Sequence, residues 1–214
     1  MVLIPAYQAG KTIGSLVREV LALGFPVVVV DDASTDGTVE AAQKSGAQVI
    51  RRSENGGKGA ALREGIPLVC KSGVDWVVTM DADGQHLVKE IPRFLQEAGK
   101  GASDIVIGNR MENPRGMPLD RRLTNRLMSW LISRVTGQWV PDTQCGFRLI
   151  SRRVLESVTL TSKRFEIESE LVLRSAKAGF RIGSIPISSV YQRNVSFIRP
   201  LRDTFRFLKL LRSL

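Results

Sequence analysis

Short runs of apolar residues alternate with segments of helical spacing through the first half of the chain. The clearest run covers residues 26–30 and contains four consecutive valines, which is typical of a strand buried on both faces of a sheet. Residues 12–23 place isoleucine, leucine and valine at intervals of three and four positions, which predicts an amphipathic helix. By the same reasoning, further strands are expected at residues 2–4, 47–50, 76–80 and 105–107, and further helices at 59–70 and 90–97.

The breaks between these segments carry turn and capping signals. Ser34 or Thr35 offers a cap for a helix after the valine run, with Asp36 in its first turn. Pro67 interrupts the helical pattern of residues 59–70, because proline lacks the backbone N–H that a helix uses. Strands separated by helices of this size predict an α/β fold, with a mainly parallel central sheet and helices on both faces.

The second half of the chain is less regular. It predicts strands at residues 147–150 and 181–187 and helices at 119–135, 165–177 and 200–214. No internal repeat, low-complexity tract or clear linker divides the sequence. We therefore expect a single domain over residues 1–214, built from a first half (1–107) and a second half (108–214).

Two acidic clusters follow predicted strands. Asp31 and Asp32 come directly after the valine run, and the sequence Asp81-Ala82-Asp83-Gly84-Gln85-His86 follows residues 76–80. Ligands of open parallel sheets bind beyond the carboxyl ends of the strands, which makes both clusters candidate ligand sites.

The alternating aspartates of the second cluster suit a divalent cation. In an extended chain Asp81 and Asp83 point to the same side, where two carboxylates repel each other unless a cation lies between them. Oxygen ligands favour Mg²⁺ or Mn²⁺, and Gln85 adds a neutral oxygen. The alternative is a capping aspartate followed by a turn at Gly84. A metal centre with several histidines is excluded, because His86 is the only histidine.

Two glycine-containing segments bear on nucleotide binding. Gly10-Lys11-Thr12 resembles the end of a P-loop, but the first glycine of that motif would fall at Pro5, which has no amide hydrogen to offer a phosphate. Residues 55–59, Asn-Gly-Gly-Lys-Gly, precede a predicted helix without the glycine order of a dinucleotide motif. This loop is either a phosphate contact or a flexible turn at a helix start.

Composition narrows the class of protein. The chain has 214 residues, a hydrophobic content of 43% that excludes wholesale disorder, and only two cysteines, Cys70 and Cys145, which fits a reducing cytoplasm. No apolar run approaches the roughly 18–20 residues that span a bilayer. The first residues also lack the basic region, apolar stretch and cleavage site of a signal peptide.

The charge is concentrated in the second half. Residues 1–107 carry 11 basic and 13 acidic side chains, whereas residues 108–214 carry 20 basic and 8 acidic ones. A basic half indicates an anionic partner, such as a nucleic acid, a phosphorylated substrate or an acidic membrane surface, or else a solubilising excess of surface charge.

Two segments of this half combine basic residues with an apolar strip. Residues 121–135, which include Trp130, and residues 200–214 could each lie in a membrane interface or pack the apolar strip on the sheet.

Taken together, these motifs resemble those of inverting family 2 glycosyltransferases of the GT-A fold, and in particular dolichol-phosphate mannose synthases and bacterial polyprenyl-phosphate glycosyltransferases. The resemblance covers nearly the whole chain. The segments that carry it are IPAYQ (4–8), VVVVDDASTDGT (27–38), NGGKGAALREG (55–65), MDADGQH (80–86), IGNR (107–110), DTQCGFRLI (142–150) and VYQRNVSFIRP (190–200).

The resemblance implies a role for each matching residue. Pro5 and Tyr7 would surround the nucleotide base, and Asp32 would hydrogen-bond to it. The residues implied at the diphosphate and at its Mg²⁺ or Mn²⁺ ion are Asp81, Asp83 and Gln85. The basic residues implied near the phosphates are Arg110 and, in a closing loop, Arg193 and Arg199.

These roles lead to a functional hypothesis. We expect metal-dependent, inverting transfer of a hexose, mannose or glucose, from a donor of the GDP-mannose or UDP-glucose type to polyprenyl phosphate. The enzyme would be peripheral on the cytoplasmic face of an anionic membrane. Asp83 would be needed for catalysis, and Asp142 would be a base, an acceptor-orienting group or only a turn aspartate after Pro141.

Two alternatives remain. One is a glycosyltransferase whose acceptor is a saccharide or a protein. The other is a basic nucleic-acid-binding protein, which would leave the acidic strand ends unexplained and has little support from an aromatic content of 6%. We therefore expect no nucleic-acid partner.

Overall fold

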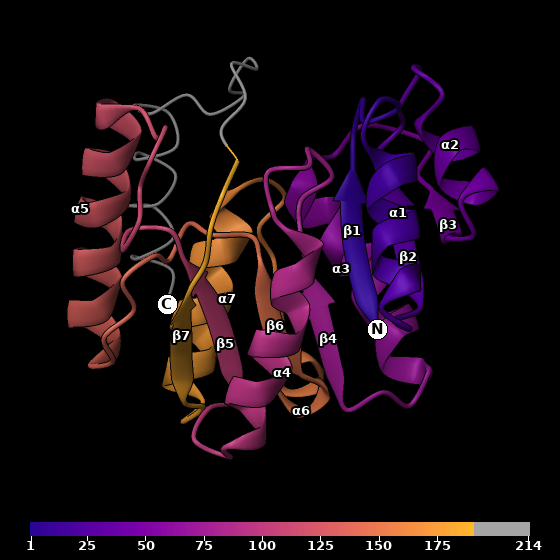
Figure 1. Ribbon diagram of the computed structural model, residues 1–214. Coiled ribbons are helices and arrows are strands. Elements are labelled where there is room, and N and C mark those ends of the chain that lie inside the picture. The colour runs from indigo at the N-terminus through magenta and orange to yellow at the C-terminus, as the bar shows by residue number, and fades with distance from the viewer. Residues whose placement is uncertain (191–214) are drawn as a thin grey trace.

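The computed structural model of the chain describes residues 1–190, so the predicted helix at 200–214, Arg193 and Arg199 lie outside the described residues. A seven-stranded sheet in the order β3-β2-β1-β4-β6-β5-β7 forms the centre of the molecule (Figure 1). The strands are β1 (Val2–Ala6), β2 (Val27–Asp31), β3 (Gln48–Arg51), β4 (Trp76–Thr79), β5 (Ile105–Asn109), β6 (Arg148–Ser151) and β7 (Ile182–Pro186).

The sheet is mostly parallel, which confirms the predicted fold class. β1 pairs in parallel with β2 on one side and β4 on the other, and β5 pairs in parallel with β7. β6 is antiparallel to both of its neighbours, β4 and β5. Because β2, β1 and β4 are adjacent and parallel, their carboxyl ends lie side by side at one edge of the sheet (Figure 1).

Helices cover both faces of the sheet. On one face lie α1 (Ile13–Ala22), the short 3₁₀ helix η1 (Val88–Glu90) and α4 (Ile91–Gly99), and on the other lie α3 (Lys58–Lys71), α6 (Arg152–Ser157) and α7 (Glu166–Lys177) (Figure 1). Two helices stand at the ends of the molecule: α2 (Thr38–Lys44) beside β3, and α5 (Leu119–Thr136) against α7. No helix among residues 1–190 is both long and apolar enough to cross a membrane.

The apolar runs form the core, as their pattern predicts. Every residue of β1 and β2 is buried, and α3 packs on these two strands. Gly65 permits this close approach, because a Cβ atom there would lie 2.5 Å from Leu3 Cδ1 and 2.8 Å from Val30 Cγ2.

Three local expectations need correction. The helix after β2 begins at Thr38 rather than after Ser34 or Thr35, because the Ser34 hydroxyl instead accepts a hydrogen bond from the Gln8 N–H at 2.9 Å. α3 continues through Pro67, since packing of its buried face on the sheet outweighs one missing helical hydrogen bond. The sequence pattern also missed α6, whose cap residue Ser151 accepts a hydrogen bond from the Val154 N–H at 3.4 Å.

Candidate active site

Asp32 is a buried carboxylate at the end of β2. Its Oδ1 atom accepts a hydrogen bond from the Gly56 N–H at 3.0 Å, and its Oδ2 atom accepts one from the Gly57 N–H at 2.7 Å. The Arg52 guanidinium also contacts Oδ1 and reaches Glu64 at 2.9 Å. Arg52 therefore neutralises this carboxylate, and the glycine-rich loop before α3 orients it.

Asp81, at the end of β4, is held by the next residue of the same loop. The Lys58 ammonium forms ion pairs with Asp81 and with Glu168 of α7. His86 Nε2 lies 3.5 Å from Asp81 Oδ2. Because adjacent residues Gly57 and Lys58 contact Asp32 and Asp81 respectively, the two acidic clusters lie together at one edge of the sheet.

The charges in this cluster follow from burial and from the ion pairs. Burial alone would raise the pKa of Asp81, but Lys58 and His86 lower it to about 2. Burial lowers the pKa of His86 to about 4 even though Asp81 opposes the shift. Burial would also lower the pKa of Lys58, but Asp81 and Glu168 raise it. At neutral pH, Asp81 and Lys58 are thus charged and His86 is neutral.

Asp83 and Gln85 complete the acidic loop. Asp83 Oδ1 accepts a hydrogen bond from the Gln85 N–H at 2.9 Å, and partial burial together with the nearby Asp81 raises the pKa of Asp83. A bound cation would offset this repulsion, and the donors present are the oxygens that Mg²⁺ and Mn²⁺ prefer. Across residues 1–190 no three histidine, cysteine, aspartate or glutamate side chains cluster closely enough to hold a metal. A cation here would therefore complete its shell with substrate oxygens and water.

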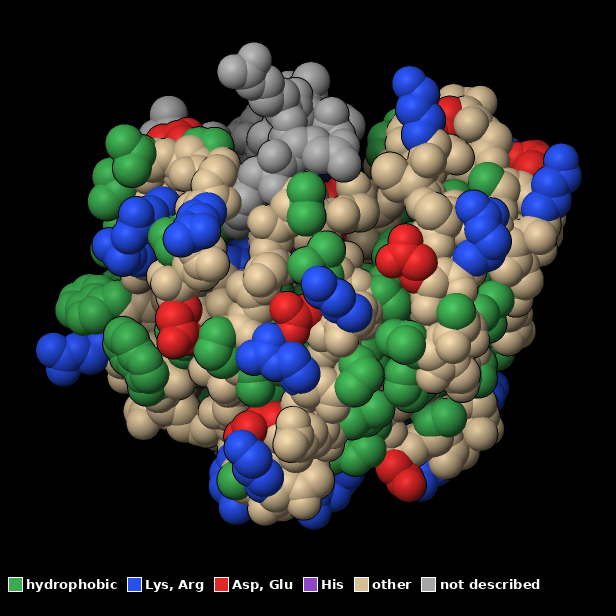
Figure 2. Space-filling model, viewed as in Figure 1, with side chains coloured by type: hydrophobic (Ala, Val, Ile, Leu, Met, Phe, Trp, Pro, Cys, Tyr) green, Lys and Arg blue, Asp and Glu red, His purple; other side chains and the backbone are tan. Residues whose placement is uncertain are grey.

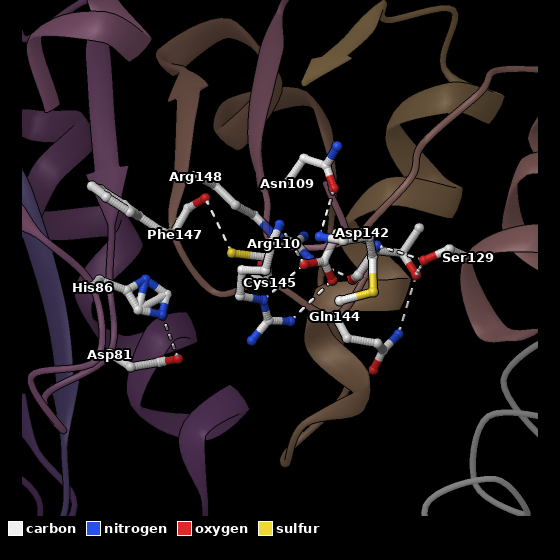
Figure 3. Close-up of polar contacts among 12 residues, drawn as sticks. Asp81, His86, Asn109, Arg110, Ser129, Asp142, Gln144, Cys145, Phe147 and Arg148 are labelled. Atoms are coloured by element: carbon white, nitrogen blue, oxygen red, sulfur yellow. Dashed lines mark hydrogen bonds and ion pairs between the residues drawn. The ribbon is translucent and has the colours of Figure 1, made fainter. Parts of the chain in front are cut away.

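Arg110, which follows β5, is paired with Asp142 in the interior. The Arg110 Nε and Nη2 atoms donate to the two oxygens of Asp142 at 2.7 and 2.9 Å, and the Arg110 backbone N–H donates at 3.1 Å (Figure 3). Asp142 is 0% exposed and Arg110 is 4% exposed. This bidentate geometry fixes the plane and direction of the guanidinium.

The segment that carries Asp142 is fixed by the buried side of α5. Ser133 Oγ accepts a hydrogen bond from the Val140 N–H, and Ser129 Oγ accepts one from the Thr143 N–H, both at 2.9 Å. From β6, the buried Arg148 side chain donates to three backbone carbonyls at 2.7–2.8 Å, which belong to Thr143, Cys145 and Glu168. α5 and β6 thus position the Arg110–Asp142 pair.

Gly146 closes over the Lys58–Asp81 pair from the side of β6. A Cβ atom at this position would lie 2.5 Å from the Lys58 Nζ and 2.8 Å from both carboxylate oxygens of Asp81. Contacts this short leave no room for a side chain, so only glycine fits without moving the pair.

The structure brings together most of the residues that the sequence singled out. Pro5 is buried within β1, and Tyr7, which is 44% exposed, follows the end of this strand next to Asp32, whose N–H donates to the Ala6 carbonyl at 2.8 Å. Arg110 follows β5, which β6 separates from β4, and pairs there with Asp142. Arg193 and Arg199 fall outside the described residues.

The sequence did not single out Lys58 or Glu168. Lys58 stood only within a glycine-rich loop, and Glu168 stood in the pattern of a helix. One signal was present: Lys58 opens α3 with no acidic residue in the first turn, which is unfavourable next to the helix dipole unless the ammonium has a partner elsewhere.

Comparisons with known proteins find relatives that match most of this chain. The family model described as glycosyl transferase family 2 matches residues 1–159. A UDP-N-acetylglucosamine–dolichyl-phosphate N-acetylglucosaminyltransferase of Methanococcus voltae is 30% identical over 212 residues, covering 88% of this chain and 84% of that protein. An undecaprenyl-phosphate mannosyltransferase of Micrococcus luteus is 32% identical over 176 residues, covering 77% of this chain and 71% of that protein.

A solved structure shows the same fold. Glucosyl-3-phosphoglycerate synthase of Mycobacterium tuberculosis, crystallised with Mn²⁺, uridine diphosphate and phosphoglyceric acid, superimposes with a TM-score of 0.76 at 20% identity. The match covers 99% of this chain and 76% of that one. The central sheet and its helices are therefore a GT-A fold.

Gly146→Ala tests how tightly the site is packed. The added methyl group should displace the Lys58–Asp81 pair and lower glycosyl transfer at least tenfold, while unfolding in urea shows a loss of about 1–3 kcal/mol from overpacking. Gly99→Ala in α4, where a Cβ atom meets nothing within 4 Å, is the matched control and should keep full activity. A Gly146→Ala variant as active as the control would show that the pair is not needed in this position.

Proposed function

The chain belongs to glycosyltransferase family 2, and from this premise we propose that it transfers a hexose from a nucleoside diphosphate sugar to a polyprenyl phosphate at a membrane surface. The observation that carries the proposal is the pairing of Asp32 and the Asp81–Asp83 loop through consecutive residues of one loop. It gives one edge of the sheet an acceptor for a nucleotide base and, next to it, a carboxylate pair for a cation on the diphosphate.

On the donor side, we propose that Pro5, Tyr7 and Asp32 bind the base. Asp81, Asp83 and Gln85 would hold Mg²⁺ or Mn²⁺, which when bound supplies positive charge to the departing diphosphate. Glucosyl-3-phosphoglycerate synthase, which has the same fold, was crystallised with Mn²⁺ and uridine diphosphate, and this supports the involvement of a divalent cation. The Val190 N–H donates to the Gln85 carbonyl at 3.0 Å. Arg193 and Arg199, which come after Val190 in the sequence, would also approach the phosphates.

Transfer would proceed by in-line attack with inversion. A polyprenyl phosphate is already ionised near neutral pH, so its oxygen needs positioning more than deprotonation. No covalent sugar–enzyme intermediate is expected, and the reaction releases a nucleoside diphosphate. Arg110 would stabilise phosphate charge as the glycosidic bond breaks.

We propose that Asp142 positions Arg110 rather than acting as a base. Its two oxygens accept three hydrogen bonds from Arg110, and its side chain has no exposed surface from which to reach an acceptor. This pairing fixes the plane and direction of the guanidinium, an arrangement that suits a phosphate.

The polyprenyl phosphate acceptor is supported by the named relatives and by the surface of α5. The relatives from Methanococcus voltae and Micrococcus luteus are named for transfer to dolichyl phosphate and undecaprenyl phosphate. A long isoprenoid chain stays in the membrane, so an enzyme that uses its phosphate needs contact with lipid.

α5 carries apolar residues on two sides: Met128 and Ile132 are buried in the core, and a second row of apolar side chains is exposed. Its buried side includes Asn125, Ser129 and Ser133, whereas four apolar side chains along the other side are 49–74% exposed: Leu119, Leu123, Leu127 and Trp130. The Arg134 guanidinium lies 5.6 Å from the centre of the Trp130 ring. In Figure 2, hydrophobic and basic side chains are mixed on the part of the surface formed by α5.

The exposed row is not used for packing, because Met128 and Ile132 already supply the apolar contacts of the buried side. Water is a poor environment for such a row, and lipid with anionic head groups satisfies both the leucines and the arginines. We propose that α5 lies on the membrane, and that the same helix, through Ser129 and Ser133, positions Asp142 on its other side.

The donor, metal and acceptor are tested in one transfer assay. We expect labelled sugar to pass from one of GDP-mannose, UDP-glucose or UDP-N-acetylglucosamine to polyprenyl phosphate but not to soluble saccharides, and EDTA to abolish the transfer. Asp83→Ala should lower the rate by about a hundredfold or more, because it removes charge stabilisation of the leaving diphosphate. Asp75→Ala, at the exposed start of β4, is the matched control and should be unaffected.

Two results would contradict the proposal. Full activity of Asp83→Ala in saturating Mn²⁺ would refute the metal assignment. Transfer to a soluble saccharide or a protein in place of the lipid phosphate would refute the acceptor.

A double-mutant cycle tests the role of Asp142. If Asp142 acts only through Arg110, Asp142→Asn and Arg110→Lys should each lower kcat about tenfold or more, and the double variant should be no slower than the worse single variant. If the decreases in kcat of the two single variants multiply in the double variant, Asp142 has an independent role, such as that of a base.

Sedimentation with vesicles tests the α5 surface. A Leu123→Glu, Leu127→Glu double variant should bind phosphatidylglycerol vesicles at least tenfold more weakly, since each substitution replaces an exposed apolar side chain that would enter the lipid with a charge repelled by the head groups. Its binding of nucleotide should be unchanged. Leu23→Glu, a comparable exposed leucine at the end of α1, is the control. Undiminished vesicle binding by the double variant would exclude α5 as the lipid contact.

A further inference from the structure

Lys58 joins two carboxylates that belong to different parts of the fold. Asp81 follows β4 in the first half of the chain, and Glu168 lies in α7 in the second half. The Lys58 ammonium contacts one oxygen of each, with only 13% of the lysine side chain and 7% of the glutamate side chain exposed. The Lys58–Glu168 pair is thus largely shielded from water and from salt, whereas the Asp81 side chain is 30% exposed.

Only one of the two carboxylate oxygens of Glu168 is used by the pair with Lys58. Its Oε1 atom pairs with Lys58, but its Oε2 atom is buried and has no hydrogen-bond partner among the described residues. The Glu168 backbone is anchored separately, because its carbonyl accepts a hydrogen bond from Arg148 Nη1 at 2.7 Å. A buried carboxylate oxygen without a partner is costly, and it is therefore a ready acceptor for one more hydrogen.

The proposed donor site places two cations at one carboxylate. A metal on the diphosphate would approach Asp81 and Asp83, where the Lys58 ammonium already neutralises Asp81. A metal ion and an ammonium group that contact the same carboxylate repel each other. Donor binding therefore requires Lys58 to release Asp81, at least in part, without leaving a buried ammonium unpaired.

This inference rests on the proposed function. We propose that the Lys58 ammonium balances the charge of Asp81 until the donor and its metal ion bind, and that it then moves from Asp81 toward Glu168, which acts as the positioning residue. The spare oxygen of Glu168 accepts the ammonium hydrogen that Asp81 gives up. Gly146 closes the opposite side of the pair, so that the movement is confined to the direction of α7.

A purely structural role for the same residues predicts something different. If the two ion pairs only fasten α7 to β4, removing either partner lowers stability and leaves metal affinity unchanged or reduced in both cases. Competition between Lys58 and the metal instead predicts opposite changes in affinity for the two partners. The sign of the change therefore separates the two interpretations.

The experiment measures Mn²⁺ binding by the electron paramagnetic resonance signal of free Mn²⁺, alone and with UDP or GDP, together with the thermal unfolding temperature. Lys58→Met should bind Mn²⁺ alone about tenfold more tightly than the unaltered chain, because the competing ammonium is gone. Glu168→Gln should bind Mn²⁺ with nucleotide about tenfold more weakly, because Lys58 then keeps Asp81 as its only anionic partner.

Asp104→Asn is the matched control. Asp104 is a buried, ion-paired carboxylate that precedes β5 and pairs with Arg153 at 2.6 Å, at the opposite edge of the sheet. This variant should lose stability without changing Mn²⁺ affinity.

Opposite shifts for Lys58→Met and Glu168→Gln would support the proposal, and shifts of the same sign or no shift in either would overturn it. If Lys58→Met does not fold, the test is a comparison of Glu168→Gln with Asp104→Asn. Equal Mn²⁺ affinity in these two variants would overturn the proposal. Failure of the unaltered chain to bind Mn²⁺ under any of these conditions would instead refute the metal assignment of the proposed function, and this inference with it.

Discussion

The site depends on one loop that supplies hydrogen-bond donors to two acidic strand ends, the buried Asp32 and the partly buried Asp81. Gly56 and Gly57 donate to Asp32, which also pairs with Arg52, and Lys58 pairs with Asp81. Carboxylates that lose water without such partners destabilise a fold, so this loop and Arg52 allow both charges to lie at one edge of the sheet. The glycines leave the backbone amides accessible, and the lysine adds the charge that amides lack.

The second half of the chain positions the site from the other side. α7 supplies Glu168 to Lys58, and β6 places Gly146 over the Lys58–Asp81 pair. α5 fixes the segment of Asp142, which in turn holds Arg110. A helix that contacts lipid with one side and this segment with the other would bring the acceptor phosphate close to the arginine, which is why we assign membrane contact and acceptor binding to the same half.

Much of the fold was predictable because its signals are local. The valine run of β2, the strand endings at Asp32 and Asp81 and the spacing of α1 all follow from patterns within a few residues, and parallel strands place their carboxyl ends together. The start of α2 was not predictable in this way, because the Ser34 hydroxyl is used by Gln8 on another strand end.

The parts of the site that the sequence did not predict depend on contacts between residues that are distant in sequence. Lys58 and Glu168 are more than a hundred positions apart in sequence, and Asp142 meets Arg110 only after β5 and the segment beside α5 are in place. The exposed apolar row of α5 was also not predictable, since apolar residues lie on two sides of this helix and the pattern does not show which of them faces the protein.

The central claim is that the donor lies between Asp32 and the Asp81–Asp83 loop, and a crystal structure of the chain with Mn²⁺ and the preferred nucleoside diphosphate tests it most directly. The account predicts the base beside Asp32 and Tyr7, with the cation about 2.0–2.3 Å from an Asp83 oxygen and bound to the diphosphate. A nucleotide bound elsewhere, or a cation that does not contact Asp83, would contradict it.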